Sequence, residues 1–358
     1  MVKLRVLRHL LLMPILIVSA LIGCVILILS FPFGLLISRQ FYVKKIARGL
    51  VARLWFILTA ATIEWICGVD VTAIVPSNIE RDEGNVVVIC NHNCRVDWLF
   101  FWCLAARYGK CGQLCIAVKS ELKNVPLFGW AIQAFCFLFL SRADREKDIE
   151  SIYRVLGQFD PIFLLIFPEG TDLSESNVAK AQKYGSTLKP PLIWHHVLIP
   201  KMLGVRAAIL ALKPKVIYDV TISYLNENQK RLDGFDCCTG NLPISVRFHV
   251  ERIPLSADIT SDTFLFKSWL FDRWAKKEKL LSSFSSSSYT CPPSHSRRSL
   301  PALQYTLALL FWLFLTWAFF YGLYCRRNLR WALLFVCLLW HVVVTRYFGG
   351  LDSVLLRT

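Results

Sequence analysis

Charged residues are scarce in this chain, at 18% of its 358 residues, and acidic residues are the scarcer kind, with 25 Asp and Glu against 41 Lys and Arg. Ordinary soluble domains have about 25% charged and about 45–50% apolar residues, whereas this chain is 55% hydrophobic. A wholly soluble protein is therefore not expected, and part of the chain should lie in lipid. The formal net charge of +16 indicates anionic lipid headgroups or phosphate-bearing ligands as partners.

Several sequence signatures are missing. No zinc finger, helix-turn-helix or RNA-binding pattern occurs, so nucleic acid is not an expected partner. The 13 cysteines are scattered. The Cys90–Cys94 and Cys111–Cys115 pairs lack the second pair or the histidines of a zinc site, so we expect no metal and interpret the cysteines as small hydrophobic residues. The chain has no Asn-x-Ser/Thr sequon, which fits a body that faces the cytosol.

Two apolar stretches near the amino terminus predict membrane anchoring. The run from Leu10 to Phe31 carries no charge and is long enough to cross a hydrocarbon core of about 30 Å. No small-residue cleavage site closes it, so a signal peptide is not expected. Basic residues flank both ends, which a helical hairpin entering and leaving on one face would explain. The second stretch, Leu54 to Cys67, contains Glu64 and is interpreted as an interfacial or packed helix.

From about residue 84 to 280, short apolar runs alternate with helical patterns, as in an α/β fold. The expected strands are 86–90, 114–118, 135–140, 162–167, 207–212, 216–224 and 245–250. The last two include alternating patterns and are candidates for antiparallel additions. A basic helix, Phe264 to Leu281, could lie on the membrane or on the domain. The predicted fold is α/β, with a mixed, mostly parallel sheet flanked by helices and with membrane helices at both ends.

The carboxyl-terminal part contains a Ser/Pro-rich segment, which predicts a flexible linker, followed by two more apolar segments. Leu303 to Cys325 is a strong membrane segment, and Trp331 to Thr345 is a weaker one. Arginines lie between them, so a shallow hairpin would fit the charge rule better than two full crossings. The predicted division is membrane-anchoring helices at 1–70, an α/β domain at 71–281, a linker at 282–301 and membrane helices or a hairpin at 302–358.

The chemistry is predicted at two strand ends. The run Val86 to Cys90 leads into a polar loop that carries His92 and Asp97, and an apolar helix follows from Leu99 to Ala106. A strand-to-helix turn is where open α/β sheets commonly bind ligands. A neutral imidazole is the usual general base near pH 7, and a carboxylate beside it fixes the tautomer. This pair suits an alcohol that must lose its proton while attacking an activated carbonyl, although a His at a strand end is more often structural.

A second turn, Phe167-Pro168-Glu169-Gly170-Thr171, follows the run 162–167. Gly170 permits a close backbone approach to a ligand. The amides near Gly170 and Thr171 could form an anion-binding nest. Glu169 is unexpected there because a carboxylate repels phosphate, so it is predicted to bond a glycerol or inositol hydroxyl or to orient basic residues. An ordinary Pro-Gly turn is the structural alternative.

Four blocks then occur in order along the chain. They are Asn91-His92-x4-Asp97-Trp98, Gly129 with Phe139-Leu140-Ser141-Arg142, Phe167-Pro168-Glu169-Gly170-Thr171 and Val197-Leu198-Ile199-Pro200-Lys201. Over residues 84–252 the chain thereby resembles glycerolipid acyltransferases of the 1-acylglycerol-3-phosphate acyltransferase type. The resemblance implies that His92 and Asp97 are catalytic and that Arg142 binds the substrate phosphate. It also places Asn91 with the substrate site, and Pro200 and Lys201 with the acyl or acyl-donor region.

Other segments are similar to the lysocardiolipin and lysophosphatidylinositol acyltransferase branch of that family, namely 119–126, 166–173, 195–200 and 347–351. Asp172 stands where many members have Arg. The lost cation weakens the case for a compact phosphomonoester and favours a larger, hydroxylated or diester headgroup.

The expected activity is transfer of an acyl group from acyl-CoA, a co-substrate, to the free hydroxyl of a lysophospholipid, without a bound cofactor. Lysophosphatidate acylation, transfer between phospholipids without CoA, and an inactive membrane-anchored lipid-binding or scaffold protein remain open. Acyl-CoA is cytosolic, so the domain is expected to face the cytosol, and the resemblance implies the endoplasmic reticulum membrane as the location.

Overall fold

The computed structural model describes most of the chain. The described residues are 2–76, 82–225, 239–256, 259–260, 262–285, 295–297 and 301–356. Eight strands form a sheet in the order β4-β3-β5-β2-β6-β7-β1-β8. Their bounds are β1 Asp70–Pro76, β2 Val86–Cys90, β3 Leu114–Lys119, β4 Leu138–Leu140, β5 Phe163–Ile166, β6 Val216–Leu225, β7 Ser245–Pro254 and β8 His295–Arg297. The strands from β4 to β6 pair in parallel, and β7 runs antiparallel to β6.

The predicted fold class is confirmed, with several differences in the strands: β8 lies in the predicted linker, and only the end of the run 135–140 forms a strand, β4. The run 207–212, expected as a strand, forms the end of helix α9, Met202–Leu212. A six-residue apolar run does not distinguish a strand from a buried helix, and the four residues before Arg206 belong to the same helix. Strand β1, which was not predicted, pairs in parallel with β7. Of the two candidates for antiparallel additions, β7 does run antiparallel to its neighbour β6, whereas β6 pairs in parallel with β2.

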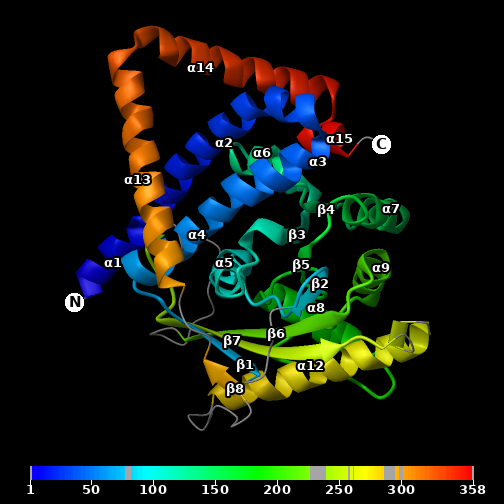
Figure 1. The fold of residues 1–358 in the computed structure, drawn as a ribbon. Coiled ribbons are helices and arrows are strands. Elements are labelled where there is room, and N and C mark those ends of the chain that lie inside the picture. Colours follow the sequence, from blue (N-terminus) through cyan, green and yellow to red (C-terminus); the bar gives the residue numbers. More distant parts are fainter. Residues whose placement is uncertain are drawn as a thin grey trace.

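Helices cover both faces of this sheet (Figure 1). Their bounds are α5 Asp97–Arg107, α6 Phe128–Ala134, α7 Arg145–Leu156, α8 Glu175–Gly185 and α12 Thr263–Ser285. Helix α12 runs along β6 and β7 on one side, while α5 lies on the other side, beneath the amino-terminal helices (Figure 1). The predicted basic helix, α12, therefore packs on the domain. Its Phe266, Leu270 and Trp274 are fully buried.

The amino-terminal helices form a hairpin. Helices α1 (Val2–Leu10) and α2 (Leu12–Ile37) are followed by a continuous helical stretch, Arg39–Ile66, that includes α3 (Arg39–Phe41) and α4 (Arg53–Ala61). The chain reverses at Ser38, which is extended and accepts a hydrogen bond from the Phe41 amide at 3.0 Å. The arms pack closely, because a Cβ on Gly34 would lie 2.6 Å from Tyr42. In the stretch expected from Leu54, side chains such as Trp55, Phe56 and Ile63 are buried, so the packed helix is the alternative that the structure supports.

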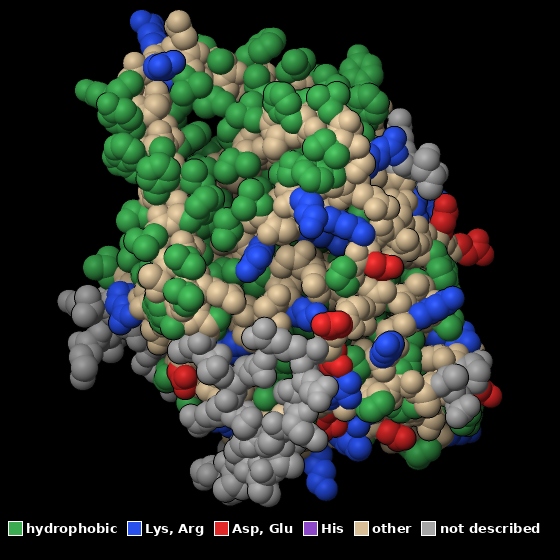
Figure 2. All heavy atoms as spheres, viewed as in Figure 1, with side chains coloured by type: hydrophobic (Ala, Val, Ile, Leu, Met, Phe, Trp, Pro, Cys, Tyr) green, Lys and Arg blue, Asp and Glu red, His purple; other side chains and the backbone are tan. Residues whose placement is uncertain are grey.

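The carboxyl-terminal helices form a second pair, α13 (Ala302–Cys325) and α14 (Arg327–Trp340), followed by the short α15 (Leu351–Leu355). The described chain contains four helices that are long and apolar enough to cross a membrane, Val6–Ile37, Arg39–Ile66, Ala302–Cys325 and Arg327–Val344. Hydrophobic side chains gather over this part of the molecule, and acidic ones lie on the opposite half (Figure 2). These apolar helices indicate a membrane protein.

Much of the predicted linker, 282–301, lies outside the described residues. Of its described parts, 282–285 belong to α12, and 295–297 form β8, which pairs antiparallel with β1.

Candidate active site

The candidate site lies where β2 and β5 end side by side. These strands pair in parallel, with Ile89 opposite Ile166, so the loops that follow them emerge at the same edge of the sheet. The loop after β2 carries His92 and leads into α5, and the loop after β5 carries the Phe167–Thr171 turn. A hydrogen bond from the Leu173 amide to the Asn93 carbonyl, at 3.3 Å, joins the two loops. The structure therefore brings together the two blocks that the sequence separates by about 75 residues.

His92 and Asp97 form a hydrogen-bonded pair. Nδ1 of His92 lies 2.9 Å from Oδ2 of Asp97, which is the first residue of α5. A carboxylate only accepts hydrogen bonds, so Nδ1 donates and the imidazole keeps its lone pair on Nε2. The Asp97 side chain is buried, while the His92 side chain is 14% exposed. The arrangement leaves Nε2 as the atom that can take a proton from a bound alcohol.

Two residues that the sequence analysis missed hold the Asp97 carboxylate. The Tyr224 hydroxyl donates to Oδ1 at 2.5 Å, and the Cys94 thiol donates to the same oxygen at 3.1 Å. The Cys94 amide lies 3.1 Å from both oxygens. Burial, reinforced by the nearby Asp97 charge, raises the pKa of the Cys94 thiol and of Tyr224 well above their ordinary values. Both groups therefore stay neutral donors, and Cys94 is no thiolate nucleophile.

The His92 ring also has a fixed plane. It stacks on Phe167 with ring centroids 4.3 Å apart and an interplanar angle of 21°. Phe167 begins the second turn, which closes with a hydrogen bond from the Gly170 amide to the Phe167 carbonyl at 3.0 Å. The second block thus orients the imidazole of the first.

Gly170 is required by both its backbone and its surroundings. Its φ of +75° lies in the left-handed region that favours glycine. A Cβ there would lie 3.3 Å from the Lys201 ammonium, so Lys201 lies against this turn. The Lys201 amide also donates to the Pro168 carbonyl at 2.8 Å. Lys201, predicted for the acyl-donor region, is therefore brought to the turn, whereas Pro200 is buried.

Arg142 reaches the same turn from the end of β4, where its guanidinium donates to the Gly170 carbonyl. Its backbone has a φ of +63°, which is uncommon for a residue with a side chain. Asp148 of α7 holds this conformation by accepting from the Ser141 amide at 2.7 Å and from the Arg142 amide at 2.8 Å. Two exposed cations, Arg142 and Lys201, thus lie beside the turn.

Glu169 points into the protein rather than toward an open site. It is 2% exposed, and its Oε1 accepts from Trp274 Nε1 of α12 at 3.0 Å. Burial raises the pKa of Glu169 to about 8, although Trp274 and the backbone of Leu198 and His92 lower it in part. At neutral pH the group is mostly protonated, so it carries little charge to repel a phosphate. This position does not fit the expected bond to a substrate hydroxyl.

Asn91 also differs from its predicted role. Its amide nitrogen donates to the Ile222 carbonyl at 3.1 Å, its oxygen accepts from the Ile222 amide at 2.8 Å, and the residue is 1% exposed. Asn91 therefore fastens the loop to β6 instead of facing a substrate. The Thr171 side chain is half-buried and accepts from Asn177 at 3.0 Å. Asp172 lies 3.8 Å from the exposed Arg95.

This chain is similar to known acyltransferases. A family model described as Acyltransferase matches residues 71–189. Lysocardiolipin acyltransferase 1 of Mus musculus is 30% identical over 332 residues, covering 87% of this chain and 84% of that protein. The 2-acyl-1-lysophosphatidylinositol acyltransferase of Saccharomyces cerevisiae is 25% identical over 334 residues, covering 76% of this chain and 84% of that protein.

A solved structure is also similar. It is the 1-acyl-sn-glycerophosphate (LPA) acyltransferase PlsC from Thermotoga maritima, with a TM-score of 0.46 and 18% identity, covering 80% of this chain and 100% of that one. The mouse relative is matched over most of both chains, and the Acyltransferase family model covers nearly all of β1 and the whole of β2 to β5. The chain therefore belongs to the glycerolipid acyltransferase family of the 1-acylglycerol-3-phosphate acyltransferase type.

Proposed function

We propose that this protein transfers a fatty acyl group from acyl-CoA to the free hydroxyl of a lysophospholipid, as part of phospholipid remodelling. The observation that carries the proposal is the bond of 2.9 Å between His92 Nδ1 and Asp97 Oδ2, at a strand end bordered by cations. Its family membership already makes the protein an acyltransferase of the lysophospholipid type. The proposal adds the donor, the acceptor and the role of each residue.

The reaction needs one proton acceptor and no protein nucleophile. Nε2 of His92 takes the proton from the acceptor hydroxyl while the oxygen adds to the thioester carbonyl. The carbon–sulfur bond then breaks, and the proton passes from His92 to the departing CoA thiolate. Asp97 holds the tautomer and stabilises the imidazolium in between. Atoms and charge balance without an external oxidant or metal.

The cations beside the Phe167–Thr171 turn suit a phosphate-bearing acceptor. Arg142 and Lys201 both lie against Gly170, and Glu169 beneath them is mostly neutral. A guanidinium and an ammonium together can hold a phosphate by charge-assisted hydrogen bonds. Asp172, half-buried two residues after Gly170 and 3.8 Å from Arg95, adds an acceptor for a hydroxylated headgroup. We therefore favour lysophosphatidylinositol, lysocardiolipin or a similar acceptor over lysophosphatidate.

The apolar helices hold the protein at a bilayer, where the lysophospholipid acceptor lies. The donor, acyl-CoA, is water-soluble and cytosolic. We therefore propose that the α/β domain faces the cytosol at the endoplasmic reticulum membrane. The cytosolic side rests on the solubility of acyl-CoA, and the membrane rests on the four apolar helices. The choice of the endoplasmic reticulum is what the resemblance to the family implies.

The test uses membranes that carry the full chain, radiolabelled oleoyl-CoA or arachidonoyl-CoA, and a panel of lysophospholipids. Labelled product from lysophosphatidylinositol or lysocardiolipin is the expected result. Preference for lysophosphatidate would assign the protein to de novo synthesis instead. No transfer to any acceptor, with protein correctly inserted, would overturn the proposal and favour the transacylase or scaffold alternatives.

A further inference from the structure

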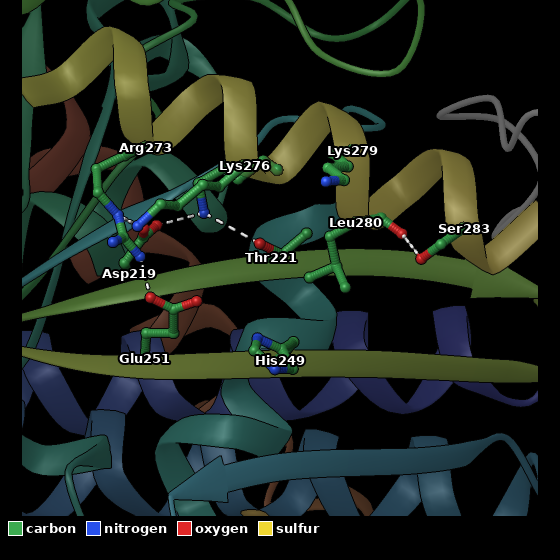
Figure 3. A pocket seen from close by; sticks show the side chains of 10 residues that line it. Asp219, Thr221, His249, Glu251, Arg273, Lys276, Lys279, Leu280 and Ser283 are labelled. Atoms are coloured by element: carbon green, nitrogen blue, oxygen red, sulfur yellow. Dashed lines mark hydrogen bonds and ion pairs between the residues drawn. The ribbon is translucent and has the colours of Figure 1, made fainter. Parts of the chain in front are cut away.

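A charged pocket lies on the other side of the Glu169–Trp274 contact. It has a volume of about 360 Å³ and lies between α12 and strands β6 and β7. Figure 3 shows basic side chains of the helix facing polar side chains of the two strands. The lining residues are Asp219, Thr221, His249, Glu251, Arg273, Lys276, Lys277, Lys279, Leu280 and Ser283. A volume of this size is at the lower end of the range for small-molecule sites.

The buried charges of the pocket are largely paired with one another. Asp219 is 4% exposed and lies 2.6 Å from Arg273 and 2.5 Å from Lys277. Arg273 also bonds to Glu251. Lys277, which is 2% exposed, lies 3.3 Å from the Thr221 hydroxyl. These ion pairs hold the walls of the pocket in place.

Two cations remain beyond these pairs. Lys276 and Lys279 line the same pocket and are exposed, and neither forms an ion pair with any described residue. The lining thus contains four cationic side chains against two carboxylates. The excess of positive charge favours an anion. Glu251, whose side chain is 40% exposed, and Thr221 can bond hydroxyl groups beside it.

The pocket is separate from the candidate active site. Trp274 stands between them, because its Nε1 bonds Glu169 and Lys277 lies 5.2 Å from its ring centroid. Helix α12 also lies at the end of the molecule opposite α14 (Figure 1). A ligand of this pocket can therefore come from solution without occupying the space next to His92.

We propose that this pocket binds a small phosphate ester, with its phosphate held by Lys276 and Lys279 and a hydroxyl group facing Glu251. The phosphate can belong to a dissolved ester or to a lipid headgroup. The distance of α12 from the apolar helices favours the dissolved ester. The inference does not rest on the proposed acyl transfer.

The test measures thermal unfolding of the full-length protein in detergent during titration with four probes. These are inorganic phosphate, inositol 1-phosphate, adenosine 3′,5′-bisphosphate and a short-chain phosphatidylinositol. A ligand that binds the folded state raises the unfolding temperature in a saturable way. We expect a rise with at least one of the phosphate esters.

The variants locate the bound phosphate. The double variant Lys276→Ala/Lys279→Ala should weaken binding about tenfold or more, because each lost ammonium removes a charged hydrogen bond. Lys180→Ala/Lys183→Ala removes the same charge at the same spacing from α8 and should bind as the wild type does. Arg142→Ala removes a cation of the candidate active site and should also leave this binding intact.

The outcomes separate the sources and the sites. Binding of soluble esters that only Lys276→Ala/Lys279→Ala weakens would support the dissolved ligand, and binding of the short-chain lipid alone would support a headgroup. No saturable rise with any probe would overturn the proposal. Loss of binding in Arg142→Ala but not in Lys276→Ala/Lys279→Ala would also overturn it, because the phosphate would then lie next to His92.

Discussion

The Asp97 carboxylate shows what a single residue contributes to this site. It bonds His92 through Oδ2, while Tyr224 and the Cys94 thiol occupy Oδ1. A buried carboxylate with several fixed donors keeps one orientation. The imidazole is therefore positioned before any substrate arrives, and Tyr224 of β6 is a positioning residue for it.

The variant Tyr224→Phe tests this role. We expect kcat to fall about tenfold with little change in KM, because loss of one hydrogen bond of about 1.5 kcal/mol loosens the Asp97–His92 pair but touches no substrate. Steady-state kinetics checks this. Tyr218→Phe is the matched control, since Tyr218 is also on β6 and bonds Asp82 at 2.8 Å, far from His92 in the strand. Equal losses of kcat in both variants would refute a specific role for Tyr224.

The raised pKa of Glu169 predicts how the stability of the protein depends on pH. This pKa is about 8 in the folded protein against an ordinary value of 4.5. Between about pH 4.5 and about pH 8, the folded state therefore keeps a proton on Glu169 that the unfolded state has released. The stability that this proton contributes to the folded state is fully present below about pH 4.5 and is lost as the pH rises through about 8. The variant Glu169→Gln keeps an oxygen that accepts from Trp274 but has no carboxyl group to ionise.

Thermal unfolding of both proteins from about pH 5 to about pH 9 measures this difference. The wild type should lose stability relative to Glu169→Gln as the pH rises. Parallel curves for the two proteins would show that Glu169 ionises as freely in the folded state as in the unfolded one.

The sequence predicted residue types better than it predicted their contacts. His92 and Asp97 could be paired because they lie five residues apart at one turn. Asn91 and Glu169 were assigned to the substrate, yet their partners, Ile222 and Trp274, lie more than a hundred residues away. Tyr224 was included in a predicted strand, but its contact with Asp97 depends on which strand neighbours β2. A single sequence does not specify that neighbour.

At the scale of the element, a buried ion pair joins the amino-terminal apolar helices to α5. Glu64, in the helix Arg39–Ile66, accepts two hydrogen bonds from Arg107 of α5, at 2.8 and 2.6 Å. Tyr305 of α13 donates to Glu64 at 2.6 Å. The side chains of Arg107 and Glu64 are 1% and 5% exposed. Glu64, the acidic residue within this apolar stretch, thus joins α5, which begins with Asp97, to the apolar helices.

Glu64→Ala should therefore destabilise the protein by about 3–5 kcal/mol, because it leaves the Arg107 charge buried without its partner. Tyr305→Phe is the matched control and should cost about 1 kcal/mol, because it removes a single hydrogen bond and keeps the ion pair. Denaturant unfolding in detergent compares the two variants. A loss for Glu64→Ala no larger than that for Tyr305→Phe would contradict this account.

Elements were predictable where their length or pattern was distinctive. The run of Val86 to Cys90 matches β2 residue for residue, because a short β-branched run bounded by polar loops is typical of a central parallel strand. The prediction of a strand at 207–212 was wrong because its six apolar residues fit a strand or a buried helix equally well, and α9 begins earlier, at Met202. Strand β1 was missed, since only three residues separate its seven residues from the apolar helix that ends at Ile66.

At the scale of the whole molecule, the carboxyl-terminal tail returns to the α/β domain. The Leu351 amide donates to Gln133 of α6 at 2.9 Å, and Asp352 lies 2.5 Å from Lys123. Leu351 and Leu355 are buried. The segment 347–350, Tyr-Phe-Gly-Gly, is thus followed by a docked helix, α15. The sequence did not indicate the surface that receives α15, because that surface lies more than 200 residues earlier in the chain.

This docking predicts that the carboxyl terminus and the α/β domain lie on the same side of the membrane. An epitope appended after Thr358 and a labelled cysteine at the exposed Ser186 should become accessible together in selectively permeabilised cells. Agents that open only the outer cell membrane should expose both if that side is the cytosol. Access to one probe without the other would contradict the docked arrangement of α15.

The central claim is that His92 acts as the base of an acyl transfer, and one measurement tests it most directly. The rate of label transfer from acyl-CoA to the preferred lysophospholipid is compared for the wild type, His92→Ala and His196→Ala, each inserted to the same level. His196 bonds Glu278 at 3.0 Å outside the site and serves as the control. We predict a loss of about 10²–10⁴-fold for His92→Ala and an unchanged rate for His196→Ala. Undiminished transfer by His92→Ala would contradict the account.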